Sequence, residues 1–225
     1  MAEPESGAGR EETAAVDGQR LPTLGVLVSG RGSNLRAILD AIERGELPAR
    51  VSIVISSRAG VPALDIAAAH GIPARVIAPR DYPSRAEEGA AIVAALRGAG
   101  VNLVVLAGFA RIFDPCVVRA YPYRILNIHP SLLPAFAGGM APKPQADALA
   151  AGVKLSGCTV HFVTDEVDAG PIIAQAAVPV LDDDTVERLA ERILAAEHQL
   201  LPTAIRHVLE GHPRIEGKRV LFDQE

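Results

Sequence analysis

The sequence has 225 residues, 49% of them hydrophobic, and its 27 acidic and 22 basic residues give a formal net charge of −5. This size allows one large domain with a substantial core, and the acidic balance argues against binding to bulk nucleic acid or to a membrane surface. Aromatic residues make up only 4% and tryptophan is absent, so stacked-base platforms are not expected. No apolar run approaches the roughly 20 residues that a bilayer-spanning helix needs.

The N-terminal segment and the two cysteines bear on domain organisation and on the cellular compartment. Residues 1–21 are polar, acidic and glycine-rich and lack the apolar stretch of a signal peptide, so we predict a disordered tail. Residues 22–225 are predicted to form a single domain. Cys116 and Cys158 lie in apolar contexts without CxxC spacing, which favours buried free thiols in a reducing compartment, and we expect a cytoplasmic protein.

Strand and helix patterns alternate through the first half of the chain. Strands are predicted at 24–29, 51–56, 74–77 and 101–107, and helices between them at 35–44, 62–70 and 85–98. This alternation is typical of an α/β protein with a Rossmann-like, mostly parallel sheet flanked by helices.

The second half follows another pattern. A short strand at 124–129 precedes a predicted loop at 135–145, which is rich in Gly, Ala and Pro, and a helix at 145–151. Residues 159–163 and 172–180 alternate like a hairpin-like pair of half-exposed strands, so the sheet is expected to be mixed here. The remaining predicted elements are a long helix at 185–210, which contains Pro202, and a final strand at 221–222.

The turn from Ser29 to Asn34, with the sequence Ser-Gly-Arg-Gly-Ser-Asn, joins the first predicted strand to the first helix. Unpaired N–H groups and the helix dipole favour an anion there, and the glycines allow close approach, so one interpretation is a phosphate site. The turn lacks the GxGxxG fingerprint and the lysine of a P-loop. A tight turn capped by Ser33 or Asn34 explains it equally well.

Asn127 and His129 are two residues apart on an extended backbone, so their side chains point to the same face. Pro130 and Pro134 end the strand and hold its exit rigid. An amide and an imidazole at a strand end can serve a reaction on a small electrophile, although a single histidine is more often structural. For His161 a packing or supporting role is the better interpretation.

Residues 164–171 form an acidic turn between two predicted strands, and Gly170-Pro171 gives it a defined shape. Most acidic turns are merely solvated. A carboxylate from this turn that reached His129 would raise the pKa of the imidazole and favour its charged form.

Four motifs in this order resemble the phosphoribosylglycinamide formyltransferases, over about residues 24–222. They are Leu-Val-Ser-Gly-Arg-Gly-Ser-Asn-Leu at 27–35, Val-Leu-Ala-Gly-Phe-Ala-Arg-Ile at 105–112, Leu-Asn-Ile-His-Pro-Ser-Leu-Leu-Pro at 126–134 and His-Phe-Val-Thr-Asp-Glu-Val-Asp-Ala-Gly-Pro at 161–171. The resemblance implies the formyltransferase fold and transfer of a formyl group from 10-formyltetrahydrofolate to the amine of glycinamide ribonucleotide. It implies no metal and no nucleic-acid or membrane partner. We expect a monomer or a homodimer.

The resemblance also assigns residues. Asn127, His129 and Asp168 match the catalytic positions, with Asp168 expected to keep His129 charged. Gly32, Ser33 and Asn34 match the positions that bind the nucleotide phosphate, and Glu197 the position that contacts its sugar. The folate positions are matched by Arg85, Ala110, Arg111, Ile112, Phe113, Asn127, Thr164, Asp165, Glu166, Val167 and Asp168.

Residues 136–145 depart from the family pattern. The usual Pro is Ala137, a usual His is missing, and the segment is about three residues longer by alignment to that pattern. Because this loop is expected to close over the substrates, its change bears on closure and rate.

Three other interpretations remain open. A methionyl-tRNA formyltransferase would share the Asn-x-His core but would need a further basic C-terminal domain, and a formyltetrahydrofolate hydrolase would need an N-terminal regulatory domain. A nucleotide-binding module that has lost catalysis through the altered loop is the third.

Overall fold

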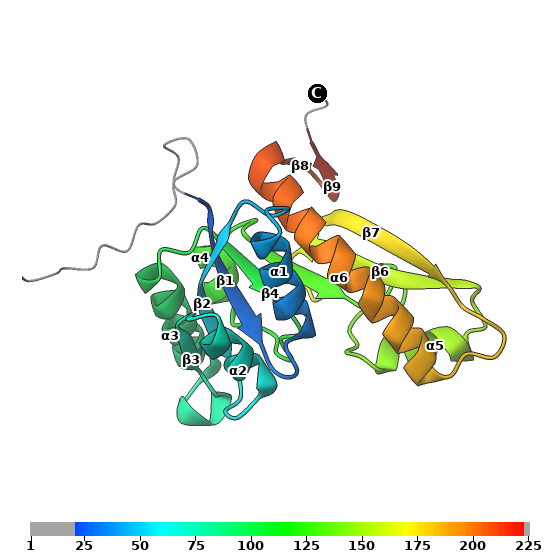
Figure 1. The fold of residues 1–225 in the computed structure, drawn as a ribbon, viewed down its shortest axis with the longest axis horizontal. Helices are drawn as coiled ribbons and strands as arrows, with labels where there is room; N and C mark the ends of the chain where they lie inside the picture. The colour runs from blue at the N-terminus through cyan, green and yellow to red at the C-terminus, as the bar shows by residue number, and fades with distance from the viewer. Residues whose placement is uncertain (1–20, 223–225) are drawn as a thin grey trace, which may run out of the picture.

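The computed structural model describes residues 21–222, and a nine-stranded sheet runs through them in the order β3-β2-β1-β4-β5-β6-β7-β9-β8 (Figure 1). The predicted tail, apart from Leu21, lies outside the described residues. The strands are β1 (Thr23–Val28), β2 (Arg50–Ser56), β3 (Ala74–Val76), β4 (Leu103–Leu106), β5 (Ile125–His129), β6 (Leu155–Phe162), β7 (Ile172–Pro179), β8 (Arg214–Glu216) and β9 (Arg219–Leu221). The helices are α1 (Ser33–Glu43), α2 (Pro62–Ala69), α3 (Arg85–Gly98), α4 (Pro115–Ala120), α5 (Lys143–Ala150) and α6 (Val186–Gly211), with a 3-10 turn η1 at Pro79–Asp81.

The first five strands are parallel, as the alternation of elements predicts. β1 lies between β2 and β4, so the chain leaves β1 toward one edge of the sheet and returns to its other side at β4. The loops after β1 and β4 therefore diverge at the carboxyl ends of the strands. Such a crevice is where open α/β sheets bind their ligands.

The C-terminal part of the sheet is mixed, also as predicted. β6 pairs antiparallel with β5 and with β7, while β9 is parallel to β7 and antiparallel to β8. Because β6 is antiparallel to β5, its last residue, Phe162, lies opposite Leu126 near the start of β5. The acidic turn between β6 and β7 nevertheless brings Asp168 within 3.3 Å of His129 at the end of β5.

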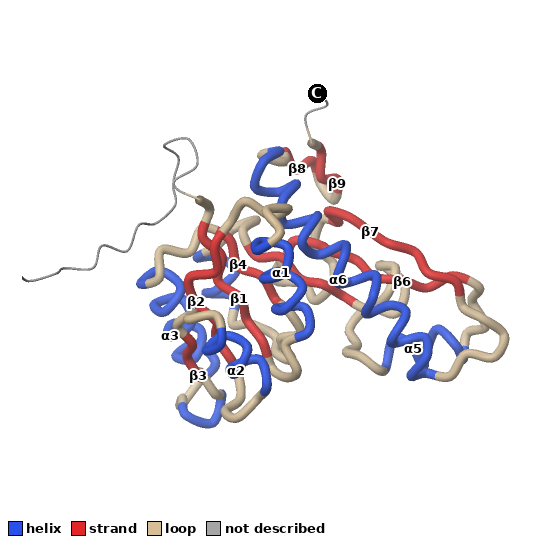
Figure 2. Tube along the Cα trace, viewed as in Figure 1, coloured by secondary structure: helices blue, strands red, loops and turns tan. Residues whose placement is uncertain are grey.

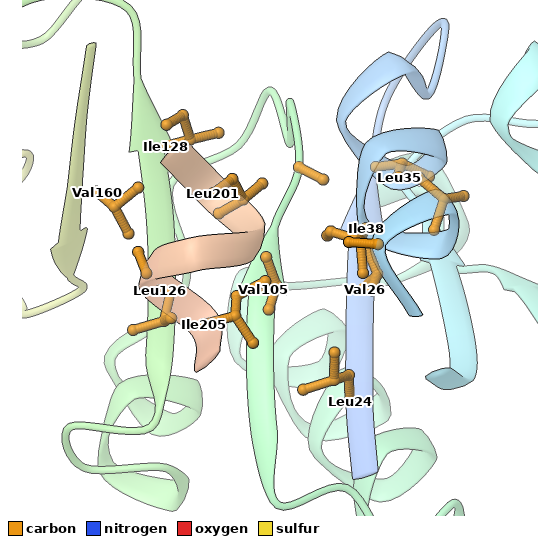
Figure 3. Close-up of a cluster of buried hydrophobic side chains, with 14 of the residues drawn as sticks. Leu24, Val26, Leu35, Ile38, Val105, Leu126, Ile128, Val160, Leu201 and Ile205 are labelled. Carbon is orange, nitrogen blue, oxygen red and sulfur yellow. The ribbon is translucent and has the colours of Figure 1, made fainter. Parts of the chain in front are cut away.

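Helices cover both faces of the sheet, and side chains that alternate along the strands fill the two interfaces. Val26 and Val28 belong to the core cluster beneath α1, α2, α5 and α6, whereas Leu27 belongs to the cluster beneath α3 and α4. Figure 2 shows α6 running past α1 along the strands of the C-terminal half. Figure 3 shows part of the first cluster, in which sheet residues meet side chains of α1 and α6: Val26, Val105, Leu126, Leu35, Ile38, Leu201 and Ile205.

Several element boundaries differ from those predicted. α5 begins at Lys143, two residues earlier than expected, because Pro144 occupies its first turn, where a missing N–H costs nothing. α4 was not predicted, although Asp114 caps it by accepting from Cys116 N at 2.9 Å. β8 was not predicted either, because its three residues, Arg-Ile-Glu, are too few and too charged to show the alternation of a strand. α6 continues through Pro202 to Gly211.

Candidate active site

A cavity of about 360 Å³ opens at the carboxyl ends of β1, β4 and β5. It is lined by the turn after β1, the segment after β4, the end of β5, residues 138–141 of the loop that follows β5, the β6–β7 loop and two positions of α6. Of the residues assigned from the sequence, those lining the cavity are Gly32, Ser33, Asn34, Arg111, Ile112, Phe113, Asn127, His129, Thr164, Asp165, Glu166, Val167, Asp168 and Glu197. Arg85 and Ala110 are not among its lining residues.

The N-terminus of α1 faces this cavity without a side-chain cap. Gly32 is the N-cap residue in the left-handed conformation (φ 76°), so the predicted capping by Ser33 or Asn34 is wrong. The helix begins at Ser33, so neither Ser33 nor Asn34 occupies the N-cap position. The first N–H groups of the helix are therefore available to bind an anion. A side chain at position 32 could not be accommodated, because its Cβ would lie 2.8 Å from the Cα of Ala63.

The side chain of Asn34, in the turn after β1, is hydrogen-bonded to the side chain of Glu197 on α6. The Nδ2 of Asn34 donates to Oε2 of Glu197 at 2.8 Å, while the buried Oδ1 of Asn34 has no hydrogen-bond partner among the described residues. Burial raises the pKa of the Glu197 carboxyl to about 7, and the bond from Asn34 opposes that shift. Asn34 and Glu197, which are 163 residues apart in the sequence, both line the cavity.

Asn127 and His129 project from the same face of β5, as the alternation along a strand requires. Antiparallel pairing sets Asn127 opposite His161 and His129 opposite Thr159. The imidazole of His129 is 3% exposed.

Asp168 reaches both histidines. Its Oδ2 lies 3.3 Å from Nδ1 of His129 and its Oδ1 lies 3.6 Å from Nε2 of His161, and the N–H of Gly138 donates to Oδ2 at 2.9 Å. Asp168 has φ 51°, a left-handed conformation that is uncommon for a residue with a side chain and is often found at functional sites. Burial alone would raise the pKa of Asp168, but its contacts with His161, Gly138 and His129 together hold it below the usual value.

The ionisation of His129 differs from the prediction. Burial lowers the pKa of His129, and this effect exceeds the upward effects of Asp168 and of the Phe136 carbonyl, so the expectation that Asp168 keeps the ring charged is wrong. Nε2 of His129 lies 3.1 Å from the carbonyl oxygen of Phe136, so both ring nitrogens face acceptors. A neutral ring carries one N–H and can satisfy only one of them.

His161 belongs to the site, although the sequence did not assign it there. Its Nδ1 lies 2.9 Å from the carbonyl oxygen of Phe162, an acceptor only, and therefore carries a proton. Nε2 then accepts a hydrogen bond from Nδ2 of Asn127 at 3.2 Å. No local signal in the sequence marked it, because the pairing of β5 with β6 that sets residue 161 opposite residue 127 joins strands separated by α5.

The other end of the cavity is apolar at its rim. Ile112, in the segment after β4, and Val167, in the β6–β7 loop, are 63% and 45% exposed, and both line the cavity. The guanidinium of Arg85 donates to the carbonyl oxygens of Ile112 and Phe113 at 3.1 and 2.7 Å. Arg85 therefore touches the backbone of this rim from outside.

Residues 21–222 contain no group of three or more His, Cys, Asp or Glu side chains placed to hold a metal ion. Within the same residues, no helix combines the length and the apolar character required for crossing a membrane.

Comparison with known proteins gives the family. The family model described as Formyl transferase matches residues 24–205. The chain belongs to this family. That assignment confirms the family expected from the four motifs.

Individual relatives cover nearly all of the chain. Phosphoribosylglycinamide formyltransferase from Mycobacterium tuberculosis is 47% identical over 180 residues, which are 80% of this chain and 81% of that protein. The solved structure of glycinamide ribonucleotide transformylase 1 from Symbiobacterium toebii is 50% identical and superposes with a TM-score of 0.87, covering 92% of this chain and 99% of the other. This match confirms the predicted formyltransferase fold.

Longer relatives also match. The trifunctional purine biosynthetic protein adenosine-3 of Bos taurus is 47% identical over 201 residues, which are 89% of this chain. The matched region is 20% of the bovine protein, so the chain spans about a fifth of that relative's length.

Proposed function

We propose that this protein transfers a formyl group from 10-formyltetrahydrofolate to the primary amine of glycinamide ribonucleotide. The observation that carries the proposal is the convergence of Asn127, His129 and Asp168 between an uncapped helix N-terminus and an apolar rim. A phosphate suits the first of these ends and a flat heteroaromatic ring suits the second. Relatives that carry the name of this activity support the same reaction.

In this proposal the N-terminal half holds the nucleotide. The phosphate lies on the N–H groups that follow Gly32, and Asn34 and Glu197 accept hydrogen bonds from sugar hydroxyls through their free oxygen atoms. The folate ring lies between the 110–113 segment and the 164–168 turn, where backbone groups and the side chains of Ile112 and Val167 contact it. Residues 22–222 act as one domain.

Attack of the neutral amine on the formyl carbon turns the formyl oxygen into an oxyanion. Asn127 donates a hydrogen bond to it from Nδ2, whose other hydrogen is held by His161. One well-placed donor of this kind contributes roughly 3–4 kcal/mol to the transition state. Binding both substrates in contact contributes up to about 7–11 kcal/mol more.

His129 then moves the proton. Because burial keeps the ring neutral, it can accept a proton from the attacking nitrogen, and Asp168 at 3.3 Å stabilises the imidazolium that results. The same proton passes to N10 of the folate as the carbon–nitrogen bond breaks, so the products are the formylated amide and tetrahydrofolate. The Phe136 carbonyl must release Nε2 of His129 for this step, which gives the 136–142 loop a part in the reaction cycle.

The cellular setting is proposed from the cysteines. The free thiols of Cys116 and Cys158 support a reducing, cytoplasmic location. A monomer or a homodimer is proposed as the active form.

The test is a steady-state assay with both substrates, followed by the appearance of tetrahydrofolate and of formylated nucleotide. Formation of the two products in equal amounts supports the proposal. Release of formate without nucleotide would assign a hydrolase, and formylation of methionyl-tRNA would assign the tRNA enzyme. Nucleotide binding measured by calorimetry, without turnover, would favour the nucleotide-binding module that has lost catalysis.

A further inference from the structure

The segment from Ala110 to Phe113 has no regular secondary structure, yet side chains from two other elements hold it. It follows β4 and forms one wall of the cavity. A loop that must present its backbone to a planar ligand needs a fixed shape, since each free backbone residue costs about 1–2 kcal/mol to order on binding.

The inner anchor is Ser29, the residue that precedes the phosphate turn. The N–H of Ala110 donates to Oγ of Ser29 at 2.8 Å, across 81 residues of sequence. Oγ of Ser29 also lies 2.7 Å from Oγ of Ser57, and both serines are buried. Ser29 therefore links the 110–113 segment of the proposed folate subsite to the turn of the proposed nucleotide subsite.

The outer anchor is Glu88 on α3. Its Oε2 accepts from NH2 of Arg111 at 3.1 Å, and the Glu88 side chain is 9% exposed against 34% for Arg111. Nε of Arg111 is buried and has no partner among the described residues, so removal of Glu88 would leave the guanidinium with still fewer partners. A carboxylate this buried is rarely present without a charged partner, which indicates that the pair forms as a unit.

The position of α3 is itself fixed. Gly89 lies against α4, where a Cβ would come within 2.7 Å of Sγ of Cys116. This close approach sets Glu88, the preceding residue, at a constant distance from the segment. Arg85, one turn earlier on α3, bonds to the carbonyl oxygens of Ile112 and Phe113.

We propose that Ser29 and Glu88 are positioning residues for the folate donor: they fix the 110–113 segment from its two sides, and so set donor affinity without touching the donor. The inference rests on the proposed function and adds to it two residues outside the cavity lining. Nothing in it requires either side chain to contact the nucleotide or the reacting atoms.

The variants are Ser29→Ala, Glu88→Ala and Glu88→Gln. In the first two, KM for 10-formyltetrahydrofolate should rise about tenfold, the equivalent of one hydrogen bond to a charged or well-buried partner. KM for the nucleotide should stay within about twofold, because the turn at Gly32 keeps its own bonds. Glu88→Gln keeps an oxygen that can accept from Arg111 and should recover part of the donor affinity.

Two matched controls come from the same elements. Ser57→Ala removes the hydroxyl beside Ser29 but leaves the bond between Ala110 and Ser29, and Glu87→Gln changes the exposed neighbouring carboxylate on α3. Both should keep donor KM within about twofold of the unchanged protein. Amide hydrogen exchange at residues 110–113 should quicken in Ser29→Ala and Glu88→Ala and not in the controls.

The outcomes separate this inference from the proposed function. Unchanged donor KM in both alanine variants, or an equal rise of both KM values with a fall in melting temperature, overturns it. If the unchanged protein has no transferase activity, the proposed function fails, and the exchange experiment still decides whether the two residues hold the segment. If Glu88→Ala does not fold, donor KM and amide exchange in Ser29→Ala still decide the inference.

Discussion

Nδ2 of Asn127 lies 3.2 Å from Nε2 of His161, across the antiparallel pairing of β5 with β6. The imidazole is 2% exposed and its other nitrogen is bound to a backbone carbonyl, so the ring cannot turn away. This contact fixes which way the Asn127 amide points, and a fixed donor is what a developing oxyanion requires.

His161→Ala should therefore lower kcat by roughly tenfold while KM for either substrate changes little, since the lost interaction acts on the transition state. Steady-state kinetics with each substrate varied in turn measures this split. His70→Ala, at an exposed histidine on the far end of α2, is the matched control and should leave kcat unchanged. A variant at position 161 with normal kcat would show that Asn127 is held by other means.

His129→Ala should lower kcat by roughly 100- to 10,000-fold, the usual contribution of a positioned acid or base. Nucleotide affinity, measured by calorimetry, should remain nearly unchanged because Gly32, Asn34 and Glu197 do not depend on this ring. Retention of most of the rate would remove His129 from the mechanism.

Asp168→Asn should slow transfer strongly and shift the pH dependence. The carboxylate of Asp168 raises the pKa of His129 against the effect of burial, so its loss should lower that pKa further. The acidic limb of the profile of kcat/KM against pH should then move to lower pH. Asp183→Asn, at an exposed acid before α6 and outside the cavity, is the control, and coincident profiles for Asp168→Asn and the unchanged protein would contradict the coupling.

Glu197 should make stability depend on pH near neutrality. Its folded pKa of about 7 lies above the value of 4.5 for a free glutamate, so its contribution is fully present below pH 4.5 and is lost as the pH rises through 7. Between about pH 5.5 and pH 8.5 this loss amounts to about 2 kcal/mol. Glu197→Gln cannot ionise and should lack this component.

Urea unfolding of both proteins at these two pH values measures the difference. The free energy of unfolding should fall more for the unchanged protein than for Glu197→Gln as the pH rises. Equal changes in the free energy of unfolding of the two proteins would show that Glu197 does not titrate in this pH range.

The parallel half of the fold could be predicted from the sequence because its signals are local. Apolar runs such as 101–107 and amphipathic helices such as 35–44 carry their periods within a few residues, and the observed β4 and α1 agree closely with them. Asn127 and His129 share a face by the alternation of a strand alone. The family motifs supplied the remaining site positions, including Asp168 and Glu197.

The ionisation of His129 could not be predicted in this way. A nearby acid and burial push the pKa in opposite directions, and the larger effect depends on how completely the fold encloses the ring. The same applies to the cap of α1, where the start of the helix at Ser33 removed both predicted capping residues.

The sequence by itself determined the order of strands and helices, the polar pair on β5 and the family to which the chain belongs, because each depends on neighbouring residues or on contiguous motifs. Only the tertiary structure decided that His161 holds Asn127, that Asp168 contacts two histidines, and that Ser29 and Glu88 hold the 110–113 segment. These contacts join residues from 7 to 81 positions apart, and their distances and burial arise only when the chain folds.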